Sequence, residues 1–376
     1  MQNSDEATTL RDDQRAEAFA ERVFTASVDT FELASMYLGM ELGFYTALLE
    51  QGPLTTSELA TLTGAHERYV REWLEQQTIA GILETAPETR NGALQAQRFL
   101  LPTAYAGLLV QPDAEHGYGA LGGMLAAIAS VALQTPAVIE AFRTGGGVPF
   151  EDYGADCALG GDAMGSSNFH THIGSTWIPT MPDVHQRLLA QPPARVADIG
   201  MGGGSSSIAL ALAFPLATVD GFDLDPVSVE LARRSAERAG VADRVHFYCQ
   251  DVATVTSNEP YDLVMAFTCI HDMSQPVAIL QVMRQMAGAH GAVFVQDPMV
   301  EPFSGVAGSM DERLVYSASV LHCLPVSMAS QPSAATGMAM QVDTLRGYAL
   351  EAGFSDVQVL PIKDDLSTIG YYRLIP

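Results

Sequence analysis

The sequence predicts an α/β fold in the C-terminal half of the chain, preceded by an α-rich region. Three observations support this. A glycine-rich turn at 200–204 joins an apolar run to a helical run, and further apolar runs of strand length alternate with helical stretches after it. The first 50 residues carry apolar side chains at helical spacing. With 376 residues, 48% of them hydrophobic, the chain can form more than one domain.

The first 110 residues predict a winged helix. Apolar positions at 16–50 predict one or two amphipathic helices. Two short helices are expected from Thr55 and from Glu67, and strands on either side of an Asn-Gly turn at 91–92 are expected to form a hairpin. Helices followed by a hairpin make a winged-helix domain, which we place at 1–110.

The charge of the chain excludes polyanions as partners. It has 19 Lys and Arg against 44 Asp and Glu, a net charge of −25, which repels nucleic acid and anionic membrane surfaces. Residues 1–110 hold 7 Arg, no Lys and 16 acids, and the helix that would enter a DNA groove carries Glu67, Glu72 and Glu75. Because DNA affinity needs an excess of cations, we expect this domain to pair with a second copy of the chain instead.

Neither a membrane span nor an oxidising compartment is indicated. Residues 116–139 are uncharged, but Gln-Thr-Pro at 134–136 interrupts them, so we interpret the segment as a packed or interface helix. The four cysteines form no CxxC pair and the N-terminus is polar and acidic, which favours a cytoplasmic location.

Residues 111–191 are partly helical and rich in glycine, and we interpret them as a linker and cap. His170 and His172 would point in one direction on a strand and could then bind a metal. Their surroundings predict a helix, which favours ordinary polar helix positions. Pro-Pro at 192–193 marks the start of the third domain, 192–376.

The third domain begins with a strand at 195–199 and the glycine turn. Gly200, Gly202 and Gly204 permit a tight turn that approaches a ligand closely, before a helix whose free N–H groups face an anion. Ser205 stands where a nicotinamide or flavin loop places its third glycine. Further strands are expected at 217–223, 244–249, 261–267, 291–296, 356–360 and 370–374. Strand–helix units in succession predict a Rossmann-like, doubly wound sheet that binds its ligand at the carboxyl ends of the strands.

Acidic residues follow the second and third of these strands. Asp223 stands 19 residues after Gly204, where a carboxylate can accept hydrogen bonds from ribose hydroxyls; Asp225 and Asp220 are alternatives for this role. Asp251 follows the third strand.

The glycine turn, with Asp198 in the preceding strand, resembles motif I of class I S-adenosylmethionine (SAM) methyltransferases. The resemblance continues through motifs II, III and IV and covers about residues 195–374. It implies a seven-stranded methyltransferase sheet, SAM as cofactor with S-adenosylhomocysteine (SAH) as product, and Asp251 against the adenine amino group. The cofactor-binding residues that it implies are Asp198, Gly200, Gly202, Gly204, Asp223, Leu224, Asp251, Val252 and Phe267.

The segment 40–101 resembles the N-terminal dimerisation domain of bacterial and plant small-molecule methyltransferases, through the sequences at 69–74 and 81–84. The segments 147–149 and 319–325 look like those of a bacterial subfamily of winged-helix methyltransferases. These resemblances imply a homodimer, a small-molecule acceptor and a place in small-molecule or secondary metabolism.

Candidate catalytic residues follow the fourth strand. A hydroxyl or acidic C–H acceptor needs a base, and imidazole titrates near neutral pH, so His271 is the candidate base and Asp272 is placed to orient it or to contact the cofactor. The pair resembles the His-Asp of O-methyltransferases, which usually continue with Trp where this chain has Met273. His322, in an apolar helix expected at 315–324, is a second candidate.

We therefore expect a SAM-dependent methyltransferase acting on oxygen or carbon of a small molecule. Related C-methyltransferases of 2-oxo acids hold a metal with two histidines, so His271 and His322 leave a metal-assisted reaction open. A metal is not favoured, because two imidazoles without a third protein ligand make an incomplete site. Three further functions stay open: a winged-helix regulator that binds SAM without catalysis, a SAM-dependent enzyme that does not methylate and, least favoured, a nicotinamide dehydrogenase.

Overall fold

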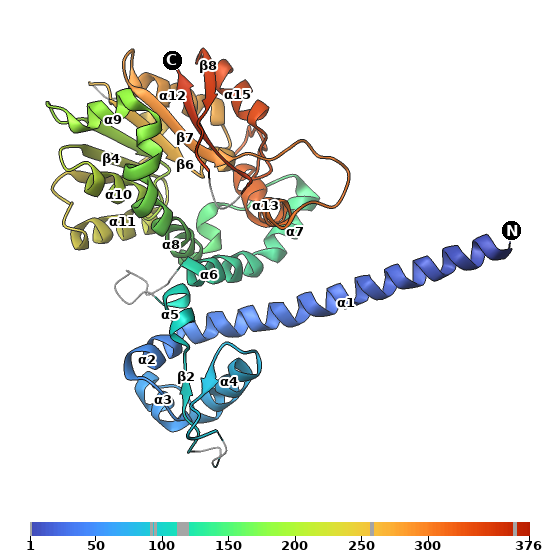
Figure 1. The fold of residues 1–376 in the computed structure, drawn as a ribbon. Coiled ribbons are helices and arrows are strands. Elements are labelled where there is room, and N and C mark those ends of the chain that lie inside the picture. Colours follow the sequence, from blue (N-terminus) through green and yellow to red (C-terminus); the bar gives the residue numbers. More distant parts are fainter. Residues whose placement is uncertain (1, 91–92, 94–95, 111–119, 256–258, 364–366) are drawn as a thin grey trace. The chain divides into compact units, whose positions relative to one another are not determined.

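The computed structural model describes the whole chain except residues 1, 91–92, 94–95, 111–119, 256–258 and 364–366 (Figure 1). The chain divides into two compact units, residues 1–125 and residues 126–376. The Asn-Gly turn expected at 91–92 and the beginning of the apolar segment 116–139 lie outside the described residues.

The first unit consists of helices and a small two-stranded sheet. Its first helix runs for 40 residues and begins well before the predicted amphipathic stretch. The two strands pair antiparallel, with Glu84 opposite Leu100, so the predicted winged helix is confirmed. The elements are α1 (Gln2–Glu41), α2 (Phe44–Gln51), α3 (Thr56–Thr63), α4 (Glu67–Ile79), β1 (Glu84–Thr85), β2 (Phe99–Leu100) and α5 (Thr103–Leu109).

Trp73 lies at the centre of the core of the first unit. Its ring centroid lies 4.8 Å from that of Phe44 and 5.1 Å from that of Tyr45. Its Nε1–H donates a hydrogen bond of 2.9 Å to the Ser35 carbonyl of α1. A Cβ at Gly39 would overlap the indole, so glycine at this position lets α1 pack closely against α4.

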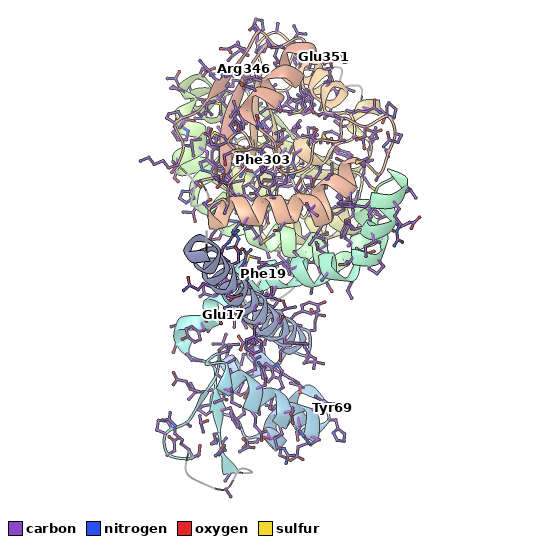
Figure 2. The ribbon with its side chains drawn as sticks, turned by 90° about the vertical axis from the view of Figure 1, so that its right-hand side faces the viewer. Glu17, Phe19, Tyr69, Phe303, Arg346 and Glu351 are labelled. Atoms are coloured by element: carbon purple, nitrogen blue, oxygen red, sulfur yellow. The ribbon has the colours of Figure 1, made fainter. Side chains whose placement is uncertain are left out.

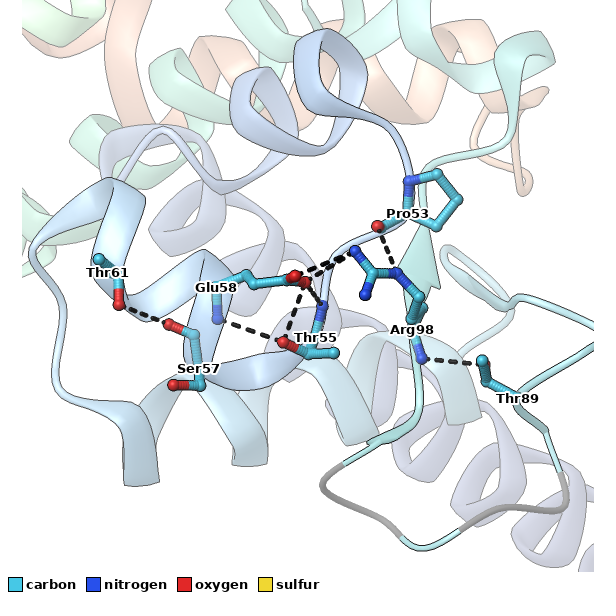
Figure 3. A network of polar contacts seen from close by, with 7 residues as sticks. All are labelled: Pro53, Thr55, Ser57, Glu58, Thr61, Thr89 and Arg98. Atoms are coloured by element: carbon cyan, nitrogen blue, oxygen red, sulfur yellow. Dashed lines mark hydrogen bonds and ion pairs between the residues drawn. The ribbon is translucent and has the colours of Figure 1, made fainter.

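A polar network connects the start of α3 to Arg98, the residue that precedes β2 (Figure 3). Thr55 and Glu58 form a capping box, in which Thr55 N donates to Glu58 Oε2 at 2.8 Å and Glu58 N donates to Thr55 Oγ1 at 3.3 Å. Arg98 pairs with Glu58 Oε2 at 2.9 Å and donates through Nε to the Pro53 carbonyl at 3.0 Å. The Thr55 backbone hydrogen bond is the main cause that lowers the pKa of Glu58, so the carboxylate stays charged beside Arg98.

The second unit is built on a seven-stranded sheet with the order β5-β4-β3-β6-β7-β9-β8. Strands β3 to β7 pair in parallel, whereas β9 runs antiparallel to both β7 and β8. The strands are β3 (Arg195–Ile199), β4 (Thr218–Asp223), β5 (Val245–Cys249), β6 (Leu263–Phe267), β7 (Ala292–Pro298), β8 (Asp356–Val359) and β9 (Ile369–Ile375). The predicted α/β class is confirmed. The strand order changes direction between β3 and β6, and a sheet of this kind binds ligands there, outside the carboxyl ends.

Helices cover both faces of this sheet (Figure 1). Along β6, Leu263, Met265 and Phe267 belong to one buried core, while Val264 and Ala266 belong to the other, as the two-residue period of a strand requires. The first core includes residues of α9 (Pro182–Leu189), α10 (Ser205–Ala213) and α11 (Pro226–Arg238), and the second includes residues of α12 (Pro276–Ala287) and α15 (Val342–Glu351).

The segment before the sheet is helical, and a π-helical turn interrupts the helix expected at 315–324. The preceding helices are α6 (Ala120–Leu133), α7 (Thr135–Thr144) and α8 (Ala155–His172), and those after β7 are α13 (Met310–Ala318), the π-turn η7 (Ser319–Cys323) and α14 (Leu324–Ser327). Within the described ranges, no single helix has the length and apolar character needed to cross a membrane; 121–133 and 135–144 meet those criteria together as a pair bent by 53°.

Candidate active site

The glycine turn lies at the carboxyl end of β3, beside the point where the strand order changes direction. Gly200 and Gly204 adopt φ of +64° and +84°, which side chains rarely allow. A Cβ at Gly200 would lie 2.9 Å from Cys269 Sγ, and one at Gly204 would lie 2.8 Å from Ala232 Cβ. Gly202, at φ +53°, faces open space. The turn therefore packs tightly at Gly200 and Gly204 and leaves room for a ligand at Gly202.

Asp198 fastens the helix that follows the turn to β3. Its Oδ2 accepts hydrogen bonds from Ser206 Oγ at 2.6 Å and Ser207 Oγ at 2.7 Å. Its Oδ1 is buried without a hydrogen-bond partner among the described residues. Burial raises the pKa of Asp198 to about 6, against the two serine hydrogen bonds. These hydrogen bonds connect β3 to the first turn of α10 and so stabilise the glycine turn between them.

Asp223 joins the end of β4 to the glycine turn. Its Oδ2 accepts from Gly202 N at 2.9 Å and its Oδ1 from Asp225 N at 2.9 Å. The side chains of Asp225 and Asp220, which were candidates for the same role, bind elsewhere. Asp225 caps α11 by accepting from Ser228 N at 2.8 Å, and Asp220 accepts from the Tyr261 hydroxyl at 2.9 Å. Burial raises the pKa of Asp223.

The other predicted cofactor residues are spread around this edge. Gln250 N donates to the Asp223 carbonyl at 2.9 Å, so the ends of β4 and β5 lie together; Asp251 is exposed there and caps a short 3-10 turn through Ala253 N. Leu224 is 69% exposed. Val252 and Phe267 are both buried in the cores. The Phe267 ring stacks on Phe169 at 5.5 Å and contacts Trp177 and Phe294, so its side chain belongs to an aromatic core rather than to the open turn.

His271 lies in a 3-10 turn, η6 (Ile270–Asp272), directly after β6 and between two carboxylates. Its Nδ1 lies 2.5 Å from Asp297 Oδ1, and its backbone N donates to Asp297 Oδ2 at 3.1 Å. Its Nε2 lies 3.2 Å from Asp272 Oδ1. Burial disfavours the charged imidazole, but Asp272 and Asp297 outweigh it and hold the pKa of His271 well above its usual range.

Asp297 was not among the predicted site residues, although the sequence placed it at the end of the fifth strand. It is fully buried at the end of β7, and its role depends on the parallel pairing of β6 with β7, which brings it beside His271. Thr268 was also missed: its φ of +53° is unusual for a residue with a β-branched side chain. Its N–H and hydroxyl both bind Gln296, at 2.7 Å each, and so turn the chain toward His271.

His322 lies in the π-turn η7 and is surrounded by thiols and aromatic rings. Its Nε2 is 3.7 Å from Cys157 Sγ and its Nδ1 is 3.5 Å from Cys323 Sγ. The rings of Tyr153 and Phe150 lie at 4.5 Å and 5.8 Å. Burial lowers the pKa of His322, so this imidazole is neutral at neutral pH.

Three potential metal ligands, one of which is His271, lie close together. Atoms of His271, Asp272 and Cys323 all lie within 4.8 Å of one another. Asp272 Oδ1 is buried and lies 3.2 Å from His271 Nε2, but it forms no hydrogen bond within the described ranges. Burial raises the pKa of the Cys323 thiol to about 12, so a metal would have to displace its proton. The group differs from the expected pair, because it includes Cys323 in place of His322.

Two sequence families match parts of the chain. Residues 196–291 match the family described as "Methyltransferase domain", and residues 33–106 match the "Rv2258c-like winged HTH domain". Curated relatives include the tRNA1(Val) (adenine(37)-N6)-methyltransferases of Yersinia pestis (strain Pestoides F) and of Yersinia pseudotuberculosis (strain IP 31758), each 31% identical over 93 residues. These matches span 24% of this chain and 34% of each relative, so the chain spans about a third of the length of these relatives.

Solved structures resemble nearly the whole chain. A putative O-methyltransferase from Nostoc punctiforme is 20% identical with a TM-score of 0.62, covering 94% of this chain and 98% of that one. The mitomycin 7-O-methyltransferase MmcR is 16% identical with a TM-score of 0.67, covering 96% and 99%. Human N-acetylserotonin methyltransferase, solved with SAM, is 16% identical with a TM-score of 0.68, covering 95% and 97%. At these identities the likeness is one of fold. The chain therefore carries a methyltransferase domain and a winged HTH domain, and its fold is that of these methyltransferases.

Proposed function

We propose that this chain transfers a methyl group from SAM to an oxygen or carbon atom of a small molecule, with His271 as general base. One observation carries the proposal. Gly200 of the glycine turn packs against Cys269, whose Sγ also donates to the Ile199 carbonyl at 3.2 Å. The turn that would hold the methyl donor is therefore in contact with the segment that carries His271.

SAM supplies an electrophilic methyl group, and the chain must align the acceptor with it and remove the acceptor proton. Alignment of reactants contributes on the order of 7–11 kcal/mol in favourable cases, and a positioned base adds about 10²–10⁴ in rate. Asp297 accepts from Nδ1–H of His271, so Nε2 is the atom that takes the acceptor proton once the imidazole has lost its own, which the raised pKa moves to alkaline pH. Asp297 then stabilises the imidazolium that forms. Asp272 lies on the Nε2 side and is proposed to share that proton.

The test combines binding and turnover. Calorimetric titration with SAH measures the cofactor site, and transfer of labelled methyl from SAM to a panel of phenols, enols and 2-oxo acids measures catalysis. His271→Gln is expected to lower methyl transfer by about 10²–10⁴ while SAH affinity stays within about twofold. His170→Gln, at an exposed histidine of α8, is the matched control. Wild-type turnover in His271→Gln would rule out the base assignment, and a chain that binds SAH but methylates no acceptor would favour the regulator.

A metal-assisted 2-oxo acid C-methyltransferase is the second candidate, supported by the proximity of His271, Asp272 and Cys323. A metal bound there would stabilise an enolate instead of leaving deprotonation to His271 alone. Dialysis against a chelator distinguishes the two: base catalysis predicts unchanged methyl transfer, and metal assistance predicts a loss that added Fe²⁺ or Zn²⁺ restores.

We also propose a homodimer formed through the winged-helix unit. Phe19, Phe24 and Phe31 of α1 are 65–79% exposed, and Tyr69 of α4, which lies at the edge of the molecule in Figure 2, is 77% exposed. Residues of α1 and α4 line a groove of about 360 Å³, among them Phe31 and Ile79, the latter 89% exposed. Burial of such side chains by a partner stabilises association by about 25 cal/mol per Å² before association costs.

Light scattering at several concentrations tests the dimer. Phe31→Asp is expected to give a monomer, whereas Phe303→Asp, at an equally exposed phenylalanine of the second unit, is expected to leave the mass unchanged. A monomeric wild-type chain would contradict the proposal.

Two further proposals concern location and domain bounds. We propose a cytoplasmic location, in keeping with four free cysteines. We also propose three domains, at 1–110, 111–191 and 192–376.

A further inference from the structure

The Asp162 carboxylate of α8 accepts hydrogen bonds from the first residue of α10. Asp162 Oδ2 accepts from Ser205 Oγ at 2.8 Å, and Asp162 Oδ1 accepts from Ser205 N at 3.2 Å. The N-cap residue, Gly204, has no side chain to make such bonds. Both donors of the first residue of α10 are thus satisfied by a residue that lies 43 positions earlier in the chain.

Gly203 makes room for this carboxylate. A Cβ at Gly203 would lie 2.5 Å from Asp162 Cγ and 2.7 Å from its Oδ1. Gly203 does not adopt a positive φ, so space rather than backbone conformation requires glycine here. Gly202, by contrast, faces open space. The glycine turn is therefore shaped on one side by Asp162.

The first turn of such a helix is where a dinucleotide-binding loop holds a pyrophosphate, because the N–H groups and the helix dipole favour anions there. A pyrophosphate at this position would compete with Asp162 for the same N–H and would face its negative charge. Asp198 and Asp223 add two further carboxylates to the same turn. Burial raises the pKa of Asp162, although the residue is only half-buried by its accessible surface.

We propose that Asp162 determines cofactor specificity: it closes the pyrophosphate position of the glycine turn, which then admits a cofactor without phosphate and rejects NAD- or FAD-like dinucleotides. The inference rests on the proposed function in one respect, that SAM is the cofactor admitted. It assigns no catalytic step to Asp162, which acts by occupying donors and by its charge.

The test measures the affinities of two probes, SAH and ADP-ribose, by calorimetry on the full chain. Asp162→Ser removes the carboxylate, and we expect it to bind ADP-ribose at least about tenfold more tightly than the wild type, equivalent to about 1.4 kcal/mol. Gly203→Ala is expected to act in the same direction, because its Cβ displaces the Asp162 carboxylate. Asp156→Ser, at a half-buried acid of the same helix, is the matched control and is expected to change neither affinity.

Asp162→Asn separates charge from shape and also serves if Asp162→Ser does not fold. It keeps an acceptor for Ser205 N and is expected to improve ADP-ribose affinity by less than Asp162→Ser. A wild type that binds SAH, with variants that bind SAH and show unchanged ADP-ribose affinity, would overturn the specificity role and leave the proposed function intact. A wild type that binds no SAH would overturn the proposed function itself.

Discussion

Replacement of Asp297 by Asn tests whether the His271 pair is a buried ion pair. Asp297 is 0% exposed and His271 1% exposed, and the two side chains meet at 2.5 Å. Asn keeps the volume and accepts the His271 backbone N–H with its one oxygen, so the change removes the charge and the acceptor for Nδ1. Breaking a buried pair costs about 3–5 kcal/mol, because the remaining charge loses its partner while it stays buried. Asp272 still lies 3.2 Å from Nε2, so we expect a loss of about 3 kcal/mol, at the lower end.

Asp183→Asn is the matched control. Asp183 also forms a close pair, with Arg373 NH1 at 2.7 Å, but it is 61% exposed. Exposed pairs contribute about 0.2–1 kcal/mol, because water screens them, so we expect a loss below about 1 kcal/mol. Urea unfolding at pH 6, followed by circular dichroism, gives both values from midpoints and slopes.

The pH dependence adds a second criterion. The pKa of His271 is raised in the folded chain above its usual 6.5, and burial raises the pKa of Asp297, so the pair contributes while Asp297 is ionised and His271 is protonated. The contribution is lost as pH rises through the folded pKa of His271. The difference between wild type and Asp297→Asn should therefore be largest below about pH 6.5 and shrink toward alkaline pH. Equal losses in the two variants, or a difference that grows with pH, would refute the assignment of a buried ion pair.

Three further predictions concern the site. Methyl transfer should rise with pH as His271 loses its proton, and Asp272→Asn should move that rise to lower pH; a rise that stays in place in the pH–rate profile would exclude His271 as its source. Gly204→Ala should cost about 2–4 kcal/mol in thermal or urea unfolding, against about 1–2 kcal/mol for Gly202→Ala, where a methyl group meets open space; equal costs would contradict the packing of the turn. Asp223→Asn should weaken SAH by about 10–100-fold in calorimetry, since an amide cannot accept from both backbone N–H groups, and an unchanged Kd would remove Asp223 from the cofactor site.

Local patterns in the sequence were sufficient for the architecture. Strand-length apolar runs alternate with helical ones, and β6 is apolar along its whole length because it is buried on both faces, so the α/β class could be predicted from hydrophobic burial. The glycines of the turn were also predictable, since positive φ at Gly200 and Gly204 leaves little choice of residue. The helix expected at 315–324 was less accurate, because no simple residue pattern signals a π-turn.

Only the tertiary structure decided which residues meet at the site. Asp297 and His271 are 26 positions apart and become partners because β6 and β7 are parallel neighbours. Asp162 reaches Ser205 from 43 positions away, which no local spacing could indicate. Phe267, a predicted cofactor residue, stacks on Phe169, which lies far from it in the sequence. Secondary structure depends on short-range periodicity that the sequence displays, whereas the electrostatics of a buried site depend on contacts between distant segments that form when the sheet assembles.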